Sequence, residues 1–329
     1  MAPAGHVSST SRRGVTGPPL DVIAGTGVWV TVFALSTGPL ADRVGLLEGL
    51  WLAGPLIVVP TALSLLRPPP GPVRELELAR RLSFPAALLL VVSILAQPGT
   101  LSALLTVPWV LVAAIALLAG LQWLVDVSSL RAKVIVPVAG LAFLAFAAVN
   151  LVAWRGQLRP FELSDTRVAV ATVHFTFVGF GASILADRTR AAATRRRSRS
   201  AAGAAGITSV IAMAVLGVGY LTDRAFITLV GSIALAAALL VLAVVTFAFA
   251  LKRDRSAGSA ALLVVSSGSV LFALALAVHF AVTSWGGGYS LSPTRMIELH
   301  GTVSGLGFVV GGLLGWTLTE LPEDIDEDE

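Results

Sequence analysis

The chain has 329 residues, of which 56% are hydrophobic and 13% are charged, with a formal net charge of +4 and a mean hydropathy of +0.86. Charged residues make up about a quarter of an average soluble domain, so this composition excludes an ordinary soluble protein and indicates a polytopic membrane protein. The pI near 10.3 indicates no nucleic-acid partner, because the basic residues lie in short segments between apolar runs. The absence of cysteine excludes disulfides and thiolate metal sites.

Apolar runs of about twenty residues, the length that crosses a bilayer, predict an all-α integral membrane bundle of about ten transmembrane helices. We expect a disordered cytoplasmic tail at 1–20, one transmembrane domain at 21–319, and an acidic cytoplasmic tail at 320–329. The weakest span, near 83–97, could pair with the next as a tight helical hairpin or form a re-entrant segment, so nine or eleven spans stay open. The expected spans lie near 21–40, 49–66, 83–97, 101–125, 133–154, 166–186, 205–221, 226–251, 259–284 and 297–319.

Lysine and arginine are unevenly distributed between the two sides of this topology. With the N-terminus inside, 17 basic residues fall on inner segments and 6 on outer segments. The positive-inside rule then places both termini in the cytoplasm. The densest basic loop, 188–199, contains Arg195, Arg196 and Arg197. We interpret it as a topology determinant, with binding of anionic lipid headgroups or docking of the acidic tail as alternatives.

The last predicted span combines glycine with a titratable residue. His300, Ser304, Gly307 and Gly311 recur on one helical face. Small residues at four-residue spacing let a neighbouring helix approach closely, and an ionisable side chain in a span usually faces protein or a water-filled cavity. We therefore expect this helix to be central in the bundle rather than lipid-facing.

Three of the four histidines, His174, His279 and His300, lie inside predicted spans. On the ten-span topology all three fall near the outer face, where Asn150 joins them. Depth and helical facing predict a polar pocket between the spans near 133–154, 166–186, 259–284 and 297–319. The residues expected on its outer rim are Glu162, Asp165, Arg295 and Glu298.

Converging imidazoles allow several kinds of chemistry. His174, His279 and His300 could hold Zn²⁺ with water as a fourth ligand, and His174 with His300 could bind a haem iron axially. Histidines that titrate near pH 6.5 could instead relay protons coupled to substrate movement. The simplest interpretation is that each histidine hydrogen-bonds a carbonyl or hydroxyl and holds helices together. No nucleotide-binding, hydrolase or metalloprotease motif is present to indicate an enzyme class.

Two stretches carry a family resemblance. Residues 172–180, TVHFTFVGF, resemble the His-Phe-His-aromatic-small-Gly-Phe signature of YndJ-like bacterial membrane proteins, and residues 299–308, LHGTVSGLGF, are similar to the late His-Gly-x-x-Asn-small-x-Gly-Phe helix of that family. The resemblance covers roughly the second half of the chain. Thr176 stands where the family often has a second His, and Ser304 where it often has Asn, which weakens a metal interpretation. The family has no assigned biochemical activity, and a transporter label is commonly attached to it because of its many spans.

The resemblance implies a YndJ-like, permease-like protein of the bacterial plasma (inner) membrane. The bilayer is its expected surroundings, and its small-molecule substrate and protein partners are unknown. A metal- or haem-dependent membrane protein or enzyme, and a non-catalytic structural or interaction protein of the envelope, are the alternatives. The residues expected to bind substrate or relay protons are Asn150, His174, His279, His300 and Ser304.

Overall fold

The computed structural model describes residues 17–68, 74–126, 131–253, 255–288 and 290–319. Every regular element in those residues is helical, and nine of the described helices are long and apolar enough to cross a membrane. The predicted all-helical, multi-pass membrane bundle is therefore confirmed. Most of the predicted N-terminal tail and the whole acidic tail lie outside the described residues. The nine helices are Leu46–Leu65, Arg74–Leu95, Thr100–Val125, Ala132–Arg155, Asp165–Ala192, Arg196–Leu221, Ala225–Ala250, Ala257–Trp285 and Thr294–Thr317.

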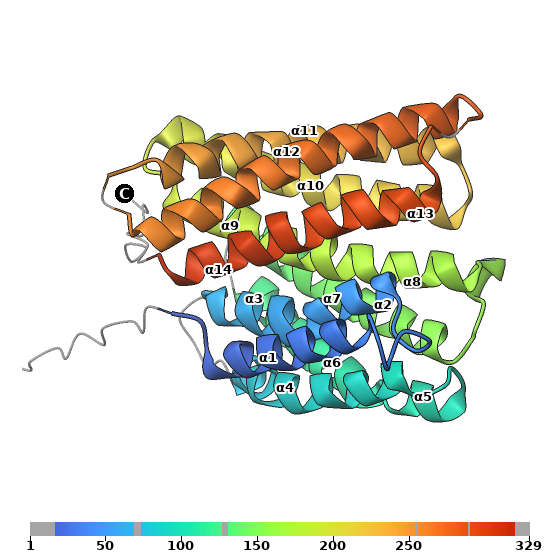
Figure 1. Ribbon diagram of the computed structural model, residues 1–329. Helices are drawn as coiled ribbons and strands as arrows, with labels where there is room; N and C mark the ends of the chain where they lie inside the picture. The colour runs from blue at the N-terminus through green and yellow to red at the C-terminus, as the bar shows by residue number, and fades with distance from the viewer. Residues whose placement is uncertain (1–16, 69–73, 127–130, 254, 289, 320–329) are drawn as a thin grey trace, which may run out of the picture.

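Three of these helices contain wider, π-helical turns, which divide them into shorter elements. Figure 1 labels the α-helical parts. In chain order the elements are α1 (Leu20–Leu35), α2 (Leu46–Ala53), η1 (Gly54–Val58), α3 (Val59–Leu65), α4 (Arg74–Leu95), α5 (Thr100–Leu104), α6 (Val107–Asp126), α7 (Ala132–Arg155), η2 (Pro160–Glu162), α8 (Asp165–His174), η3 (Phe175–Gly181), α9 (Ala182–Ala192), α10 (Arg196–Leu221), α11 (Ala225–Ala250), α12 (Ala257–Trp285), α13 (Pro293–Met296), η4 (Ile297–Gly301), η5 (Val303–Val310) and α14 (Gly311–Thr317).

Several helices differ in length from the predicted spans, α1, α4 and α10 among them. α1 ends at Leu35 and has 16 residues, about 24 Å of rise against a hydrocarbon core of about 30 Å. α4 begins at Arg74 and α10 at Arg196, each about nine residues earlier than the predicted span. Arginine and glutamate are good helix formers, so a helix continues through charged residues where the hydropathy signal ends.

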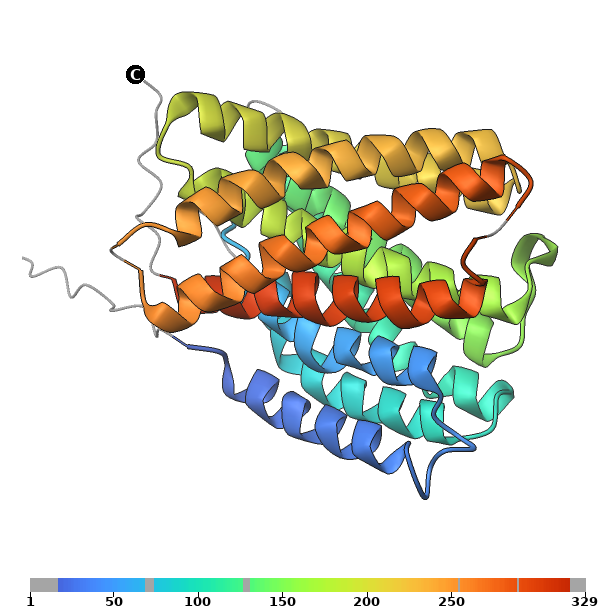
Figure 2. The same cartoon turned by 45° about the horizontal axis from the view of Figure 1, so that its top comes forward.

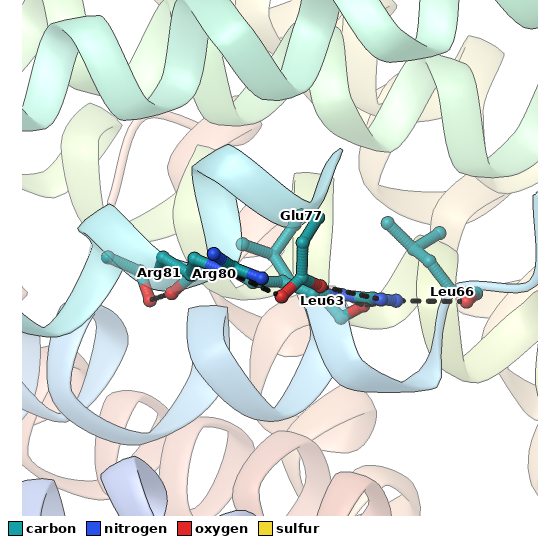
Figure 3. A network of polar contacts seen from close by, with 6 residues as sticks. Leu63, Leu66, Glu77, Arg80 and Arg81 are labelled. Atoms are coloured by element: carbon teal, nitrogen blue, oxygen red, sulfur yellow. Dashed lines mark hydrogen bonds and ion pairs between the residues drawn. The ribbon is translucent and has the colours of Figure 1, made fainter. Parts of the chain in front are cut away.

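The charged start of α4 is anchored to the preceding helix by Arg80. Its Nε and Nη2 donate to the Leu63 carbonyl at 2.9 and 2.6 Å, and Nη2 also reaches the Leu66 carbonyl at 3.3 Å (Figure 3). The next residue, Arg81, donates from its Nε to Oε1 of Glu77, one turn earlier in α4, at 2.9 Å. Arg80 thus satisfies carbonyls at the C-terminal end of α3, where a cation is favourable.

Residues 83–125 form a helical hairpin, one of the two arrangements left open by the sequence. α4 and α6 pack against each other, joined by the short α5. Gly99 turns the chain with φ 148°, in a region open to glycine. Ser93 and Ser102 lock the hairpin through reciprocal hydrogen bonds of 2.8 and 2.9 Å between hydroxyls and carbonyls.

The helices form three groups in the bundle, and the last helix returns to contact the second one. α1 to α6 lie on one side of the bundle, α10 to α12 on the other, and α7 to α9 between them (Figures 1 and 2). The last helix, from α13 to α14, runs between α12 and the helix formed by α2, η1 and α3, and it contacts both. The last described helix therefore joins α12 to the helix formed by α2, η1 and α3.

The central helix of the bundle is the second apolar helix, not the last one. The apolar stretch of Leu46–Leu65 is 83% buried, whereas that of Thr294–Thr317 is 33% buried and that of Ala257–Trp285 is 28% buried. The expectation that the last helix is central is therefore wrong. Its glycines pack closely against more than one neighbour, for example Gly307 against Ser269 of α12 and Gly312 against Leu185 of α9, while much of its remaining surface is unburied.

Candidate functional site: a histidine pair at the π-helical junction

His300 is held by a main-chain contact from the neighbouring helix. It lies in η4, and its Nδ1 is 3.0 Å from the carbonyl oxygen of Ala273 in α12. A carbonyl only accepts, so Nδ1 carries the proton and donates it. In the neutral ring Nε2 is then the free acceptor. One hydrogen bond thus sets both the orientation and the tautomer of His300.

His174 faces His300 from a different helix. It ends α8, directly before η3. The two ring centroids are 6.1 Å apart and the ring planes differ by 13°. Both side chains are half-buried and lie within helices long enough to span a membrane. If both rings were protonated, the two charges would repel by roughly 3 kcal/mol at an effective dielectric constant of about 20, so the pair is suited to hold one excess proton.

Three π-helical segments from three different helices meet beside this pair. η1, η3 and η5 contact one another. A Cβ added to Gly181 of η3 would lie 2.6 Å from a methyl of Val309 in η5 and 3.3 Å from a methyl of Val58 in η1. Similarly, a Cβ on Gly54 would lie 2.9 Å from Thr176. Such close approach requires glycine, and π-helical turns are rare and often found at functional sites.

A protein family matches most of this junction, up to Phe308 in η5. The YndJ-like protein family model matches residues 50–308, well over half of the chain. The chain belongs to the YndJ-like family. The match begins in α2 and ends in η5, so it contains η1 as well as both histidines. It therefore extends well beyond the second half of the chain, where the sequence resemblance was recognised. No curated protein and no solved structure matches this YndJ-like chain.

The other residues of the predicted pocket make hydrogen bonds to groups other than the two histidines. Asn150 is buried in α7, but its amide donates to the Phe146 carbonyl of its own helix at 2.9 Å. His279 is exposed, and its Nε2 contacts the hydroxyl of Ser290 beyond the end of α12. Ser304, one turn after His300, is half-buried and makes only a long contact of 3.4 Å to the Gly301 carbonyl.

Three of the four residues of the predicted outer rim form local ion pairs. Arg295 Nη1 donates to Glu298 Oε2 at 2.7 Å, one turn before His300. Asp165 lies 3.5 Å from Arg159 Nε. Glu162 is exposed in η2, with a positive φ of 59°. None of these contacts connects the rim to the histidines.

The described residues contain no group of three or more His, Asp or Glu side chains that could hold a metal ion. The reason is geometric: His279 is directed to Ser290, while His174 and His300 face each other. The three-histidine zinc site, one of the alternatives that the sequence left open, is therefore not assembled among the described residues.

One buried polar network was not predicted from the sequence. Arg155 lies on an outer segment of the predicted topology, but it is 4% exposed. Its Nε donates to the Ser102 hydroxyl at 2.8 Å, and its Nη2 donates to the Ser93 and Ala96 carbonyls at 2.7 and 2.8 Å. Arg155 thus caps the C-terminal end of α4. The hydroxyls of Ser93 and Ser102, nine residues apart in a hydrophobic hairpin, were the available signal.

The basic loop is also partly structural. Arg188 is 3% exposed within α9 and pairs with Asp187 at 2.7 Å. Arg195, Arg196 and Arg197 are exposed at the beginning of α10. The candidate lipid-contacting cations therefore form a shorter cluster than the 188–199 loop that was predicted.

Proposed function

We propose that this YndJ-like protein is a permease-like protein of the bacterial inner membrane in which the His174–His300 pair transfers protons coupled to movement of a small molecule. The supporting observation is the facing arrangement of two imidazoles, 6.1 Å apart, from two helices of the membrane domain. Ionisable side chains inside spans are costly and mark ion or substrate pathways. Histidine is the side chain whose unperturbed pKa lies closest to neutral pH.

The pair works as a single-proton site. His300 keeps its Nδ1 proton on the Ala273 carbonyl, so exchange occurs at Nε2. A proton taken by one ring discourages a proton on the other, because two charges at this separation repel. Release of one proton therefore accompanies uptake of another. The neighbouring π-helical segments η3 and η4 connect this exchange to the backbones of two helices.

Proton flux into proteoliposomes tests this proposal. Purified protein is reconstituted with an entrapped pH-sensitive dye, and a pH step is applied with and without a potassium–valinomycin potential. We expect His174→Ala and His300→Ala to abolish the protein-dependent flux. The matched control, His279→Ala, removes an exposed histidine bonded to Ser290 and should leave the flux unchanged.

Three outcomes would replace the proposal. If proton flux into wild-type vesicles is no faster than into protein-free vesicles under any gradient, proton transfer by the pair is ruled out. A Soret band lost in both His174→Ala and His300→Ala would instead assign the imidazole pair to a haem iron. Variants that lower thermal stability while leaving flux intact would assign the pair to holding η4 against α8.

We also propose that the short α1 is a tenth crossing and that both termini lie in the cytoplasm, because basic residues concentrate on one side of the predicted ten-span topology. The chain has no cysteine, so a single introduced thiol reports its own side. A cysteine replacing Ser198, beside exposed Arg197, should react with a membrane-impermeant maleimide only after the cells are opened. A cysteine replacing Gly287 should react in intact spheroplasts. The reverse pattern would invert the topology.

A second proposal concerns lipid. Arg195, Arg196 and Arg197 are exposed at the beginning of α10 and would contact anionic headgroups, each contributing about 1 kcal/mol near such a leaflet. Replacing all three by glutamine should weaken copurification of anionic lipid, and high salt should have the same effect on the unmodified protein. Retained lipid in the triple variant would assign these arginines to topology alone.

A further inference from the structure

A series of polar contacts runs along the interface between α12 and the last helix. Near one end, the Ser259 hydroxyl donates to the Gly315 carbonyl at 3.0 Å. In the middle, the Ser266 hydroxyl donates to the Phe308 carbonyl of η5 at 2.8 Å. Toward the other end, His300 donates to the Ala273 carbonyl. This series joins two helices whose outer faces are largely unburied.

A small cavity lies beside the middle of this interface. Its volume is about 10 Å³, at the lower limit of the space that one buried water molecule requires. Four of the residues around it carry hydroxyls, contributed by α9, α11 and α12, and all four are buried. The cavity is lined by Leu185, Thr189, Leu242, Ala243, Thr246, Ser266, Ser267, Val270, Phe308 and Trp316.

The hydroxyl protons at this cavity can be counted. Ser266 donates to Phe308 and Ser267 donates to the Leu263 carbonyl at 2.9 Å. Thr189 and Thr246 share one hydrogen bond of 2.8 Å. Only one of these two threonines can be its donor, so the hydroxyl proton of the other has no acceptor among the described residues. The lone pairs of Ser266 and Ser267 also remain open, since each hydroxyl has two.

We infer that this cavity binds one water molecule, which accepts the remaining threonine proton and donates to the Ser266 and Ser267 oxygens. Buried waters typically make about three hydrogen bonds to polar groups that lack other partners. A buried donor left unpaired would cost about 1–3 kcal/mol. The water joins α9 and α11 to α12, next to the α12 contact with η5. This site is independent of the proposed proton transfer at the histidines.

Nearby charge favours water over a sodium ion. Two residues before Thr189, the Asp187 carboxylate contacts Arg188 at 2.7 Å and Arg190 at 3.2 Å. All three side chains are largely buried, and two cations share one anion. The local excess is therefore positive and opposes a second cation, while a neutral water meets no such penalty.

The direct test is a structure of the full-length protein in lipid at a resolution that shows ordered water. We expect one peak within about 3.2 Å of three of the four hydroxyls. No peak in a well-resolved cavity would overturn the inference. A peak replaced by thallium in thallium-containing buffer would also overturn it, in favour of a monovalent cation site.

A stability cycle tests the same site without relying on density. Thr246→Val and Ser267→Ala should each lower the melting temperature, and the double variant should lose less than the sum, because both substitutions remove the same water. Ser209 is the matched control: it is buried and donates to its own helix at 2.7 Å, as Ser267 does, and it is not one of the residues lining the cavity. The pair Thr246→Val with Ser209→Ala should be additive. Additivity in both pairs would contradict a shared water.

Discussion

The second apolar helix and the last one are built from similar features but are buried very differently. Both contain π-helical turns, η1 in Leu46–Leu65 and η4 and η5 in Thr294–Thr317. Both contain glycines against which neighbouring side chains pack closely. Yet the apolar stretch of the first is 83% buried and that of the second 33%. The last helix carries the histidine and most of the glycines, whereas the second helix forms the centre.

The number of glycines in a membrane helix does not indicate how deeply that helix is buried. Lipid tails are as apolar as leucine, so hydropathy does not separate a helix surrounded by protein from one facing lipid. A glycine shows only that something approaches closely on its side. In the last helix the neighbours are α12, with Ser269 at Gly307, and α9, with Leu185 at Gly312. The rest of its surface is largely unburied.

The largest expected contrast between the two helices comes from truncating leucine. Leu56 is 0% exposed in η1, and Leu299 is 41% exposed in η4. Leu56→Ala should lower the free energy of unfolding by about 2–5 kcal/mol, because a cavity is created in the packed centre. Leu299→Ala should change it by less than about 0.5 kcal/mol. Reversible unfolding in mixed micelles measures both, and equal losses would break the contrast.

A smaller effect is expected where the two helices are brought together. Gly181 separates Val58 of η1 from Val309 of η5. Gly181→Ala should cost about 1–3 kcal/mol, since a methyl at 2.6 Å forces the packed neighbours apart. Gly268→Ala on α12 is the control, because no atom lies within 4 Å of its added methyl. A Gly181→Ala protein as stable as the control would show that the junction is not tightly packed.

The smallest effect concerns the hydrogen bonds that hold the last helix to α12. Ser259 donates across the interface to Gly315, whereas Ser209 donates within its own helix to Gly206. Ser259→Ala should cost about 0.6–1 kcal/mol, the typical strength of such a bond between membrane helices. Ser209→Ala should cost less. A thermal-shift comparison of the two variants ranks them, and a larger loss for Ser209→Ala would show that the last helix does not depend on these bonds.

The candidate site was only partly predictable. His174 and His300 were both expected in one pocket, and the structure brings their rings to 6.1 Å. Asn150 and His279 were also expected there; Asn150 donates to the Phe146 carbonyl, and His279 contacts the Ser290 hydroxyl. Helical spacing predicts which residues share a face. The rotation of each helix relative to the others depends on packing at every contact along its length.

Buried arginines show the same limit. Arg80 and Arg155 both lie outside the predicted spans. In the structure their guanidinium groups donate hydrogen bonds to carbonyls at the C-terminal ends of α3 and α4. A hydropathy profile registers only the charge. Whether an exposed helix end lies within reach of the guanidinium is a property of the folded hairpin.

By itself the sequence determined that this is an all-helical, multi-pass membrane protein of the YndJ-like type, because the bilayer imposes length and apolarity on each helix separately. The tertiary structure decided which helix is central, which two histidines face each other, and where π-helical turns meet. Those features depend on contacts between segments far apart in the chain, and since lipid and protein interiors are equally apolar, no local pattern distinguishes a neighbouring helix from the surrounding membrane.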